Sequence, residues 1–227
     1  MQNEVEEIVA LEKPSLLGMI TNPRQQFHRI RINPKIIIAL IVVTIMTMVV
    51  VLLTLKGMGD LLAEEFIGFS AEELVVIKAV IQILTIAMTL LAPVLIILIS
   101  ASVYLLIAKI AGTDVTFKQM FSLFTYLTFI STIGGIINAL YIFITKTSNP
   151  DLVITSLNGI IQADGVLGFV FSSLEIFSIW TIILTAIGLQ VVAKFPKALA
   201  WGVVIGFNLI ILAAAIMLTF ISESMVI

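Results

Sequence analysis

The chain has 227 residues, of which 60% are hydrophobic and only 11% are charged, and its mean hydropathy is +1.21. A soluble domain buries one core with far less apolar material, so this composition excludes an ordinary soluble protein and indicates that lipid solvates much of the chain. The net charge of -2 provides no basic footprint for a nucleic-acid partner, and the lack of cysteine excludes disulfides, thiolate catalysis and cysteine-based metal sites.

The segment 1–35 contains no long apolar run and is predicted to form a cytoplasmic amino-terminal segment. Within it, Pro23 and Pro34 bracket a short predicted helix in the stretch NPRQQFHRIRINP, with Phe27 and Ile30 on one side. We expect this amphipathic helix to lie in the headgroup layer of the membrane. Its basic residues are predicted to hold it on anionic lipid or, alternatively, to form a docking face for a cytoplasmic partner: Arg24, Arg29, Arg31 and Lys35.

Five long stretches lack charged residues or nearly so, and each is long enough to cross a bilayer. A helix of about 20 apolar residues spans the hydrocarbon, and only a helix satisfies all of its own backbone amides there. The predicted fold is therefore an all-α, polytopic membrane bundle. Its membrane domain covers 36–222, with five transmembrane helices over 36–55, 79–108, 120–145, 165–193 and 198–222.

The second stretch is longer than one crossing requires and contains Pro93. A reversal of the chain at this proline would leave turn backbone in lipid without polar neighbours, so we expect one tilted or kinked helix. Upstream, Ser70 is followed three residues later by Glu73. This spacing is typical of a capping box and predicts a helix that starts near Ala71.

Lysine and arginine residues indicate which way the helices cross the membrane. Nine of the twelve basic residues fall in segments that an inside amino terminus places in the cytoplasm, whereas Lys56, Lys78 and Lys146 fall outside. The outer loops instead gather acidic residues. We therefore predict that the amino terminus is inside and the carboxyl terminus outside. The second outer loop, 146–164, is rich in turn formers and is expected to be mobile.

Glu175 is the one acidic residue well inside a predicted span. An ionised carboxylate in hydrocarbon is costly, so we expect this side chain to face the bundle, either protonated or with polar partners. The partners predicted from depth or helical spacing are Asn138, Asn208, Ser172 and Ser178. A neutral packing residue is favoured over a proton or ion path, because coupled transport usually involves more than one ionisable group in the membrane.

Small residues recur at helical spacing on two of the predicted spans. Gly202 and Gly206 form a G-x-x-x-G pattern on the fifth span, and Gly168 with Ser172 forms a similar pair on the fourth. Such pairs let two helix backbones approach closely. Packing within this chain and a contact with a partner, including a second copy in a homo-oligomer, are both open interpretations.

Enzyme chemistry finds no support in the residue pattern. His28 is the only histidine and lies in the amino-terminal helix, whereas a zinc centre needs several ligands. The sequence has no second histidine for a metalloprotease or serine hydrolase, and every aspartate lies in a loop. We predict no catalytic, cofactor or metal site.

Three features of the sequence coincide. They are the NPRQQFHRIRINP helix, the five spans with an inside amino terminus, and the stretch AKIAGTDVTFKQMFSLFTYLTF, which leads into the third span. From about Ser15 onward the chain resembles the Yip domain family of membrane proteins. In that family a proline-bracketed basic segment precedes the first span, and a glycine-containing loop introduces a third helix with polar residues and a tyrosine. The matching residues here are Pro23, Arg29, Pro34, Gly112, Lys118 and Tyr126.

The sequence departs from the family pattern in two places. Many members have a proline soon after the tyrosine, where this chain has Phe129 and Ile130. The acidic Asp-Leu-Tyr-Gly-Pro type stretch of the eukaryotic Golgi members is also missing. The second departure weakens any inference of Rab-type GTPase binding and indicates a bacterial member.

The resemblance implies a membrane protein that acts by binding and not by catalysis. Eukaryotic relatives act in vesicle trafficking, while some bacterial relatives look like accessory subunits of an ABC-type exporter. Our hypothesis is an accessory or scaffold protein of a bacterial cytoplasmic membrane that assists assembly or regulation of an ABC-type export complex for toxins or peptides. Its partners would be the transporter subunits. The alternative is a small transporter or channel with a polar path around Glu175 and Asn138.

Overall fold

The computed structural model describes residues 12–58, 70–146 and 153–225. The elements in these ranges are helices, apart from one isolated antiparallel bridge between Ser156 and Glu175. Four helices are long and apolar enough to cross a membrane, and the α10 helix is a shorter apolar one. Their bounds are α4 (Ile37–Gly57), α6 (Ala71–Ile110), α7 (Phe117–Thr145), α10 (Ile176–Val192) and α11 (Lys197–Met225). The predicted all-α fold is confirmed, whereas the number of crossings and their direction stay predictions.

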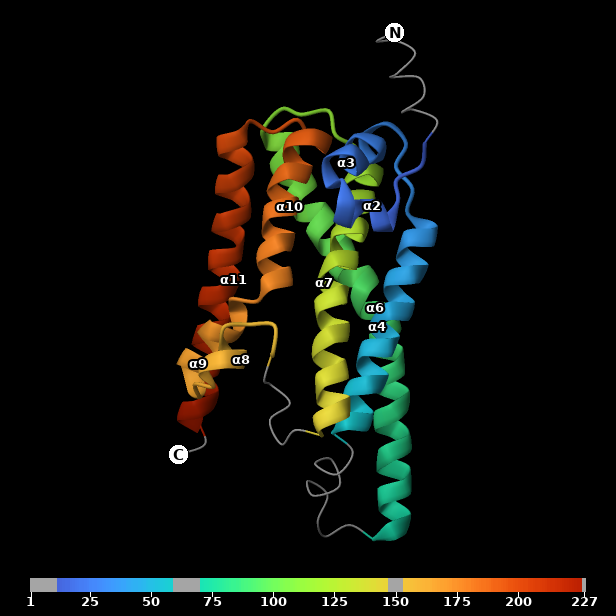
Figure 1. Ribbon diagram of the computed structural model, residues 1–227, viewed down its shortest axis with the longest axis vertical. Coiled ribbons are helices and arrows are strands. Elements are labelled where there is room, and N and C mark those ends of the chain that lie inside the picture. The colour runs from blue at the N-terminus through green and yellow to red at the C-terminus, as the bar shows by residue number, and fades with distance from the viewer. Residues whose placement is uncertain (1–11, 59–69, 147–152, 226–227) are drawn as a thin grey trace.

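The α7 helix is the centre of the bundle, and it contacts α4, α6 and α10 (Figure 1). Every residue from Met120 to Leu127 is buried, including the polar Ser122 and Thr125. A helix that is apolar on all sides is stable where neighbours surround it, so this part of α7 forms the core of the protein. The outward faces of α4, α6 and α11 expose large aliphatic side chains, as lipid-facing helices do.

The α6 helix runs unbroken through Pro93. The Ser70 side chain accepts a hydrogen bond from the Glu73 amide, and the Glu73 carboxylate accepts one from the Ser70 amide. The predicted capping box, the start at Ala71 and the single helix across Pro93 are therefore confirmed. A corresponding box formed by Thr116 and Gln119 begins α7.

The prediction of one continuous helix over residues 165–193 is wrong. The segment forms α9 (Gly165–Ser173) and α10, and the chain is extended at Glu175 between them, with φ -99° and ψ 136°. The short helix α8 (Asn158–Ile161) precedes α9. The break is possible inside the bundle because a second chain segment pairs with it: the Ile176 amide donates to the Thr155 carbonyl and the Leu157 amide donates to the Leu174 carbonyl.

The helices α2 (Leu16–Thr21) and α3 (Pro23–Ile32) lie at one end of the bundle. The α6–α7 and α10–α11 connections lie at this same end, and the last turns of α11 lie at the opposite end (Figure 1). The first helix of the described chain, α2, and the last turns of α11 therefore lie at opposite ends of the bundle, and their sides of the membrane stay predictions. The α10 helix has 17 residues, a length of about 25 Å, which is slightly less than the roughly 30 Å of hydrocarbon. Whether α10 crosses the membrane together with α9 stays a prediction.

The close contact between α4 and α7 provides a test of this packing. A Cβ atom added at Gly57 would lie 2.7 Å from the Ile142 carbonyl oxygen, whereas one added at Gly202 on α11 would meet no atom within 4 Å. We expect Gly57→Ala to destabilise the protein by about 1–3 kcal/mol, because a helix backbone has to shift. Gly202→Ala should be neutral or slightly stabilising, since alanine is the better helix former. Thermal unfolding in detergent micelles measures both, and equal melting temperatures would contradict the α4–α7 packing.

Candidate functional site

The Glu175 carboxylate caps the amino-terminal end of α10. It is 8% exposed, and one carboxylate oxygen, Oε1, accepts hydrogen bonds from the Phe177 amide at 3.0 Å and the Thr155 hydroxyl at 2.8 Å. The other, Oε2, accepts one from the Ser178 amide at 2.6 Å. The first amides of a helix have no partner within it, so an anion at this position satisfies them and interacts favourably with the helix dipole.

Thr155 connects Glu175 to the central helix. The Asn138 side-chain amide donates to the Thr155 hydroxyl at 2.9 Å and to the Gly134 carbonyl at 3.0 Å, and the Thr155 amide donates to the Asn138 side-chain oxygen at 3.3 Å. Three segments therefore meet through side chains: α7, the connection that follows it, and the α9–α10 break. We call Asn138, Thr155 and Glu175 the polar triad.

The predicted partners of Glu175 have different outcomes. Asn138 is linked to it through Thr155, and Ser178 binds it through the backbone amide and not the side chain. Asn208 donates to the Val204 carbonyl of its own helix, and Ser172 is half-buried on α9. Thr155 was not anticipated, because it lies in a segment that was expected to be mobile. The sequence did contain one local signal for the break. Glu175 follows the polar pair Ser172 and Ser173, and such polar residues are typical of the start of a helix.

The small-residue pairs lie in different environments. A Cβ atom at Gly168 would overlap the Ala163 carbonyl oxygen, so this glycine is needed for the tight approach of α9 to the connection that precedes it. At Gly202 and Gly206 a Cβ atom would meet nothing within 4 Å. Packing of the α11 pair against the described part of the chain is therefore not observed, and a contact with a partner stays a prediction.

Residues 12–35, which contain α2 and α3 and which we call the amino-terminal module, pack on the bundle through apolar side chains. Met19, Phe27 and Ile30 are fully buried, and α3 contacts α10 while α2 contacts α7. A Cβ atom at Gly188 of α10 would lie 2.7 Å from a Leu123 methyl of α7 and 3.4 Å from the Phe27 ring, so this glycine permits the close packing of α10 against α7 beside Phe27. The predicted helix at Pro23 is confirmed, but its apolar side faces protein. Its position in the headgroup layer stays a prediction.

Polar side chains on one face of α7 hold the same module by its backbone. The Gln119 side chain donates to the Arg31 carbonyl at 2.6 Å, the Ser122 hydroxyl to the Lys35 carbonyl at 2.8 Å, and the Tyr126 hydroxyl to the Pro14 carbonyl at 2.9 Å. The three donors follow helical spacing, so they form a single row. This row explains why Tyr126, a residue of the family pattern, is buried.

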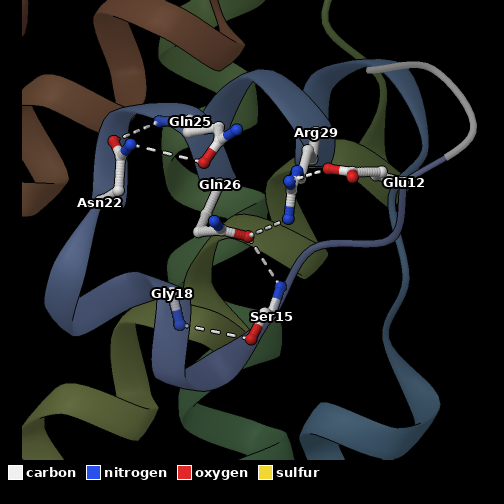
Figure 2. A network of polar contacts seen from close by, with 7 residues as sticks. All are labelled: Glu12, Ser15, Gly18, Asn22, Gln25, Gln26 and Arg29. Carbon is white, nitrogen blue, oxygen red and sulfur yellow. Dashed lines mark hydrogen bonds and ion pairs between the residues drawn. The ribbon is translucent and has the colours of Figure 1, made fainter. Parts of the chain in front are cut away.

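A hydrogen-bond network inside the module fixes its own shape (Figure 2). The Gln26 side-chain oxygen accepts from the Ser15 amide at 2.8 Å and from the Arg29 guanidinium at 3.4 Å, and Arg29 also pairs with Glu12. Asn22 caps α3 by accepting from the Gln25 amide at 3.3 Å. The Arg29 guanidinium therefore binds to residues of the module itself.

The other basic residues of the predicted docking set lie on the outside of the module. Arg24 and Lys35 are exposed. Arg31 is half-buried and lines a cavity of about 430 Å³ together with Asp114 and Lys194. Among the residues that the structure describes, no group of three or more histidine, aspartate or glutamate side chains is placed to hold a metal ion.

Replacement of Glu175 tests its role as a cap. Glu175→Gln keeps the size but gives up one acceptor oxygen, so one helix amide loses its partner and we expect a destabilisation of about 1–2 kcal/mol. Glu72→Gln, on the exposed first turn of α6, is the matched control and should melt like the parent protein. An unchanged or raised melting temperature for Glu175→Gln would mean that desolvation of the carboxylate outweighs its capping bonds.

Comparison with known proteins agrees with this architecture. The Yip1 domain matches residues 17–219. The membrane protein YknW of Bacillus subtilis (strain 168) is 34% identical over 212 residues, which cover 88% of this chain and 90% of the relative. No solved structure is detectably similar. With both the family domain and a full-length relative matched, the chain is a multi-pass membrane protein that belongs to the Yip1 domain family.

Proposed function

We propose that this protein is a non-enzymatic accessory or scaffold subunit that assists assembly or regulation of an ABC-type export complex in a bacterial cytoplasmic membrane. The similarity to a bacterial membrane protein over most of both chains supports the cellular setting. The observation that carries the proposal is the amino-terminal module, which is locked to α7 and α10 while Arg24 and Lys35 remain exposed.

The module has the properties of a prearranged binding surface. The buried side chains of the module and the row of donors on α7 hold the module in one conformation without a partner. Binding therefore does not incur the entropic cost of ordering the module. A disordered basic tail would lose conformational entropy in the same step. A fixed surface therefore favours a role in assembly.

The charge at this end of the bundle is predominantly positive. The connections beside the module carry further exposed lysines, namely Lys109, Lys118, Lys194 and Lys197. Of the described acidic residues, only Glu12 and Asp114 lie here, and Glu12 is paired with Arg29. Cations at a protein surface steer an acidic partner and orient it. We propose that five crossings place this end in the cytoplasm, where the ATPase subunits of such an exporter bind.

Copurification tests the proposal. A tagged protein, gently solubilised from its native membrane, should bring down the ATPase and membrane subunits of one ABC exporter. The double variant Arg24→Glu/Lys35→Glu should reduce their recovery by about tenfold, because two steering cations become repulsive.

The matched control is Lys56→Glu/Lys78→Glu, which reverses two exposed lysines at the opposite end of the bundle. It should recover the exporter like the parent protein. Protease protection should show that both double variants cross the membrane in the same direction as the parent protein. The remaining lysines and arginines of the inner loops maintain the charge difference that sets this direction. Absence of any ABC subunit, or equal loss in both double variants, would contradict the proposal.

The transporter alternative is less well supported by the environment of Glu175. Each carboxylate oxygen already accepts at least one hydrogen bond from the helix start or from Thr155, so a moving proton would disrupt a structural cap. We expect the purified protein in liposomes to dissipate an imposed proton gradient no faster than empty liposomes, as read by a pH-sensitive dye. A leak that Glu175→Gln abolishes and Glu72→Gln preserves would establish the alternative.

A further inference from the structure

A cavity of about 250 Å³ lies between α6, α7, α10 and α11 and opens to the outside beside the exposed Ile96 and Ile211. Hydroxyl and amide side chains converge on it from all four helices: Ser100, Tyr104, Thr128, Ser178, Thr181 and Asn208. Of the described residues that line it, none is charged. Neither the docking surface nor the polar triad uses this cavity.

Tyr104 is the most constrained of these residues. It is 3% exposed, and its ring contacts Phe124 and Phe207, with ring centroids 4.9 and 5.7 Å away. Among the described residues, no hydrogen bond engages its hydroxyl. Its hydroxyl oxygen is not among the fully buried atoms and opens onto the cavity. A hydroxyl without a partner is unfavourable within a membrane, so its position on the cavity wall indicates that an acceptor binds there.

Other groups on the wall complement the tyrosine. The Thr128 and Thr181 hydroxyls donate to the carbonyls of Phe124 and Phe177 one turn earlier. Thr181 also accepts from the Ser131 hydroxyl at 3.1 Å, whereas the lone pairs of Thr128 stay available as acceptors. Ser100 lies one turn before Tyr104 on the same face of α6. The cavity thus presents donors and acceptors side by side.

The depth of the cavity restricts the ligand. Tyr104 precedes the end of α6 at Ile110 by six residues, so it lies about 9 Å along the helix from that end. Ser178 lies further from the same end of the bundle, three residues after the Glu175 break. This span reaches beyond a headgroup layer, so the ligand must enter from the lipid phase. A phosphate or ammonium group would find no counter-charge among the lining residues.

We propose that the cavity binds an uncharged amphiphile whose hydroxyl or ester oxygens lie next to a hydrocarbon chain, the chemistry of a neutral glycerolipid. The Tyr104 hydroxyl donates to a carbonyl oxygen of this ligand, and the threonine and asparagine oxygens accept from its hydroxyl. The aromatic and aliphatic residues of the wall, such as Phe124, Phe207 and Ile211, contact the start of its chain. This site does not depend on the proposed exporter partner.

Photolabelling of the full-length protein in nanodiscs tests the site. The probe is a diacylglycerol with a diazirine on one acyl chain, and labelled peptides are mapped by mass spectrometry. We expect saturable labelling of α6, α7, α10 or α11 at the cavity. Tyr104→Phe keeps the ring contacts and should weaken apparent probe affinity by about fivefold through loss of one hydrogen bond. Tyr141→Phe, half-buried near the end of α7, should label like the parent.

Two further comparisons separate this site from general lipid contact. Ser100→Leu fills the cavity and should abolish saturable labelling, whereas Ser102→Leu, exposed on another face of α6, should not. A phosphatidylglycerol probe with the same acyl chains should compete poorly, because its charge is unmatched. Equal labelling of all variants, or equal competition by the charged lipid, would overturn the proposal.

Melting temperatures without the probe verify that the variants are folded and give an independent result. Tyr104→Phe should be as stable as the parent or slightly more stable in detergent, because the hydroxyl that is removed has no partner in the described chain. The diacylglycerol should stabilise the parent more than this variant. A large loss of stability for Tyr104→Phe in detergent would show that its hydroxyl is already satisfied and would contradict the inference.

Discussion

Lipid cannot hydrogen-bond to a peptide group, and this constraint governs how the chain interrupts a helix within the membrane domain. Between α9 and α10 the backbone leaves the helical conformation at Leu174 and Glu175. The Glu175 carboxylate satisfies the first amides of α10, and Thr155 and its neighbours pair with the extended backbone. The acidic residue that the sequence offered as a possible ion site occupies a capping position at the start of α10.

The central helix α7 binds non-helical chain at two places along its length. Near its start, Gln119, Ser122 and Tyr126 bind backbone carbonyls of the amino-terminal segment, and nearer its other end Asn138 binds Thr155. Polar residues in an otherwise apolar helix therefore mark the places where non-helical chain approaches it. Because these contacts join segments far apart in sequence, α7 fixes both the position of the amino-terminal module and the shape of the α9–α10 break.

The two polar regions of the bundle differ in how well they are satisfied. In the polar triad, the carboxylate, hydroxyl and amide groups bind one another and the backbone, which favours a structural role. In the cavity beside α11, the Tyr104 hydroxyl opens onto the cavity without a partner in the described chain. Unsatisfied polarity is expensive in a membrane and therefore indicates binding more strongly than polarity alone.

The sequence by itself determined the helical fold, the bounds of α4, α6, α7 and α11 to within a few residues, and the capped start of α6, because long apolar runs and capping pairs are local signals. Tertiary structure decided the rest. The break at Glu175 depends on Thr155, some 20 residues earlier, and the placement of Phe27 against α10 depends on a contact between the two ends of the chain. Hydropathy cannot reveal such pairings, because in a membrane protein the same apolar side chain is equally suited to lipid and to a neighbouring helix.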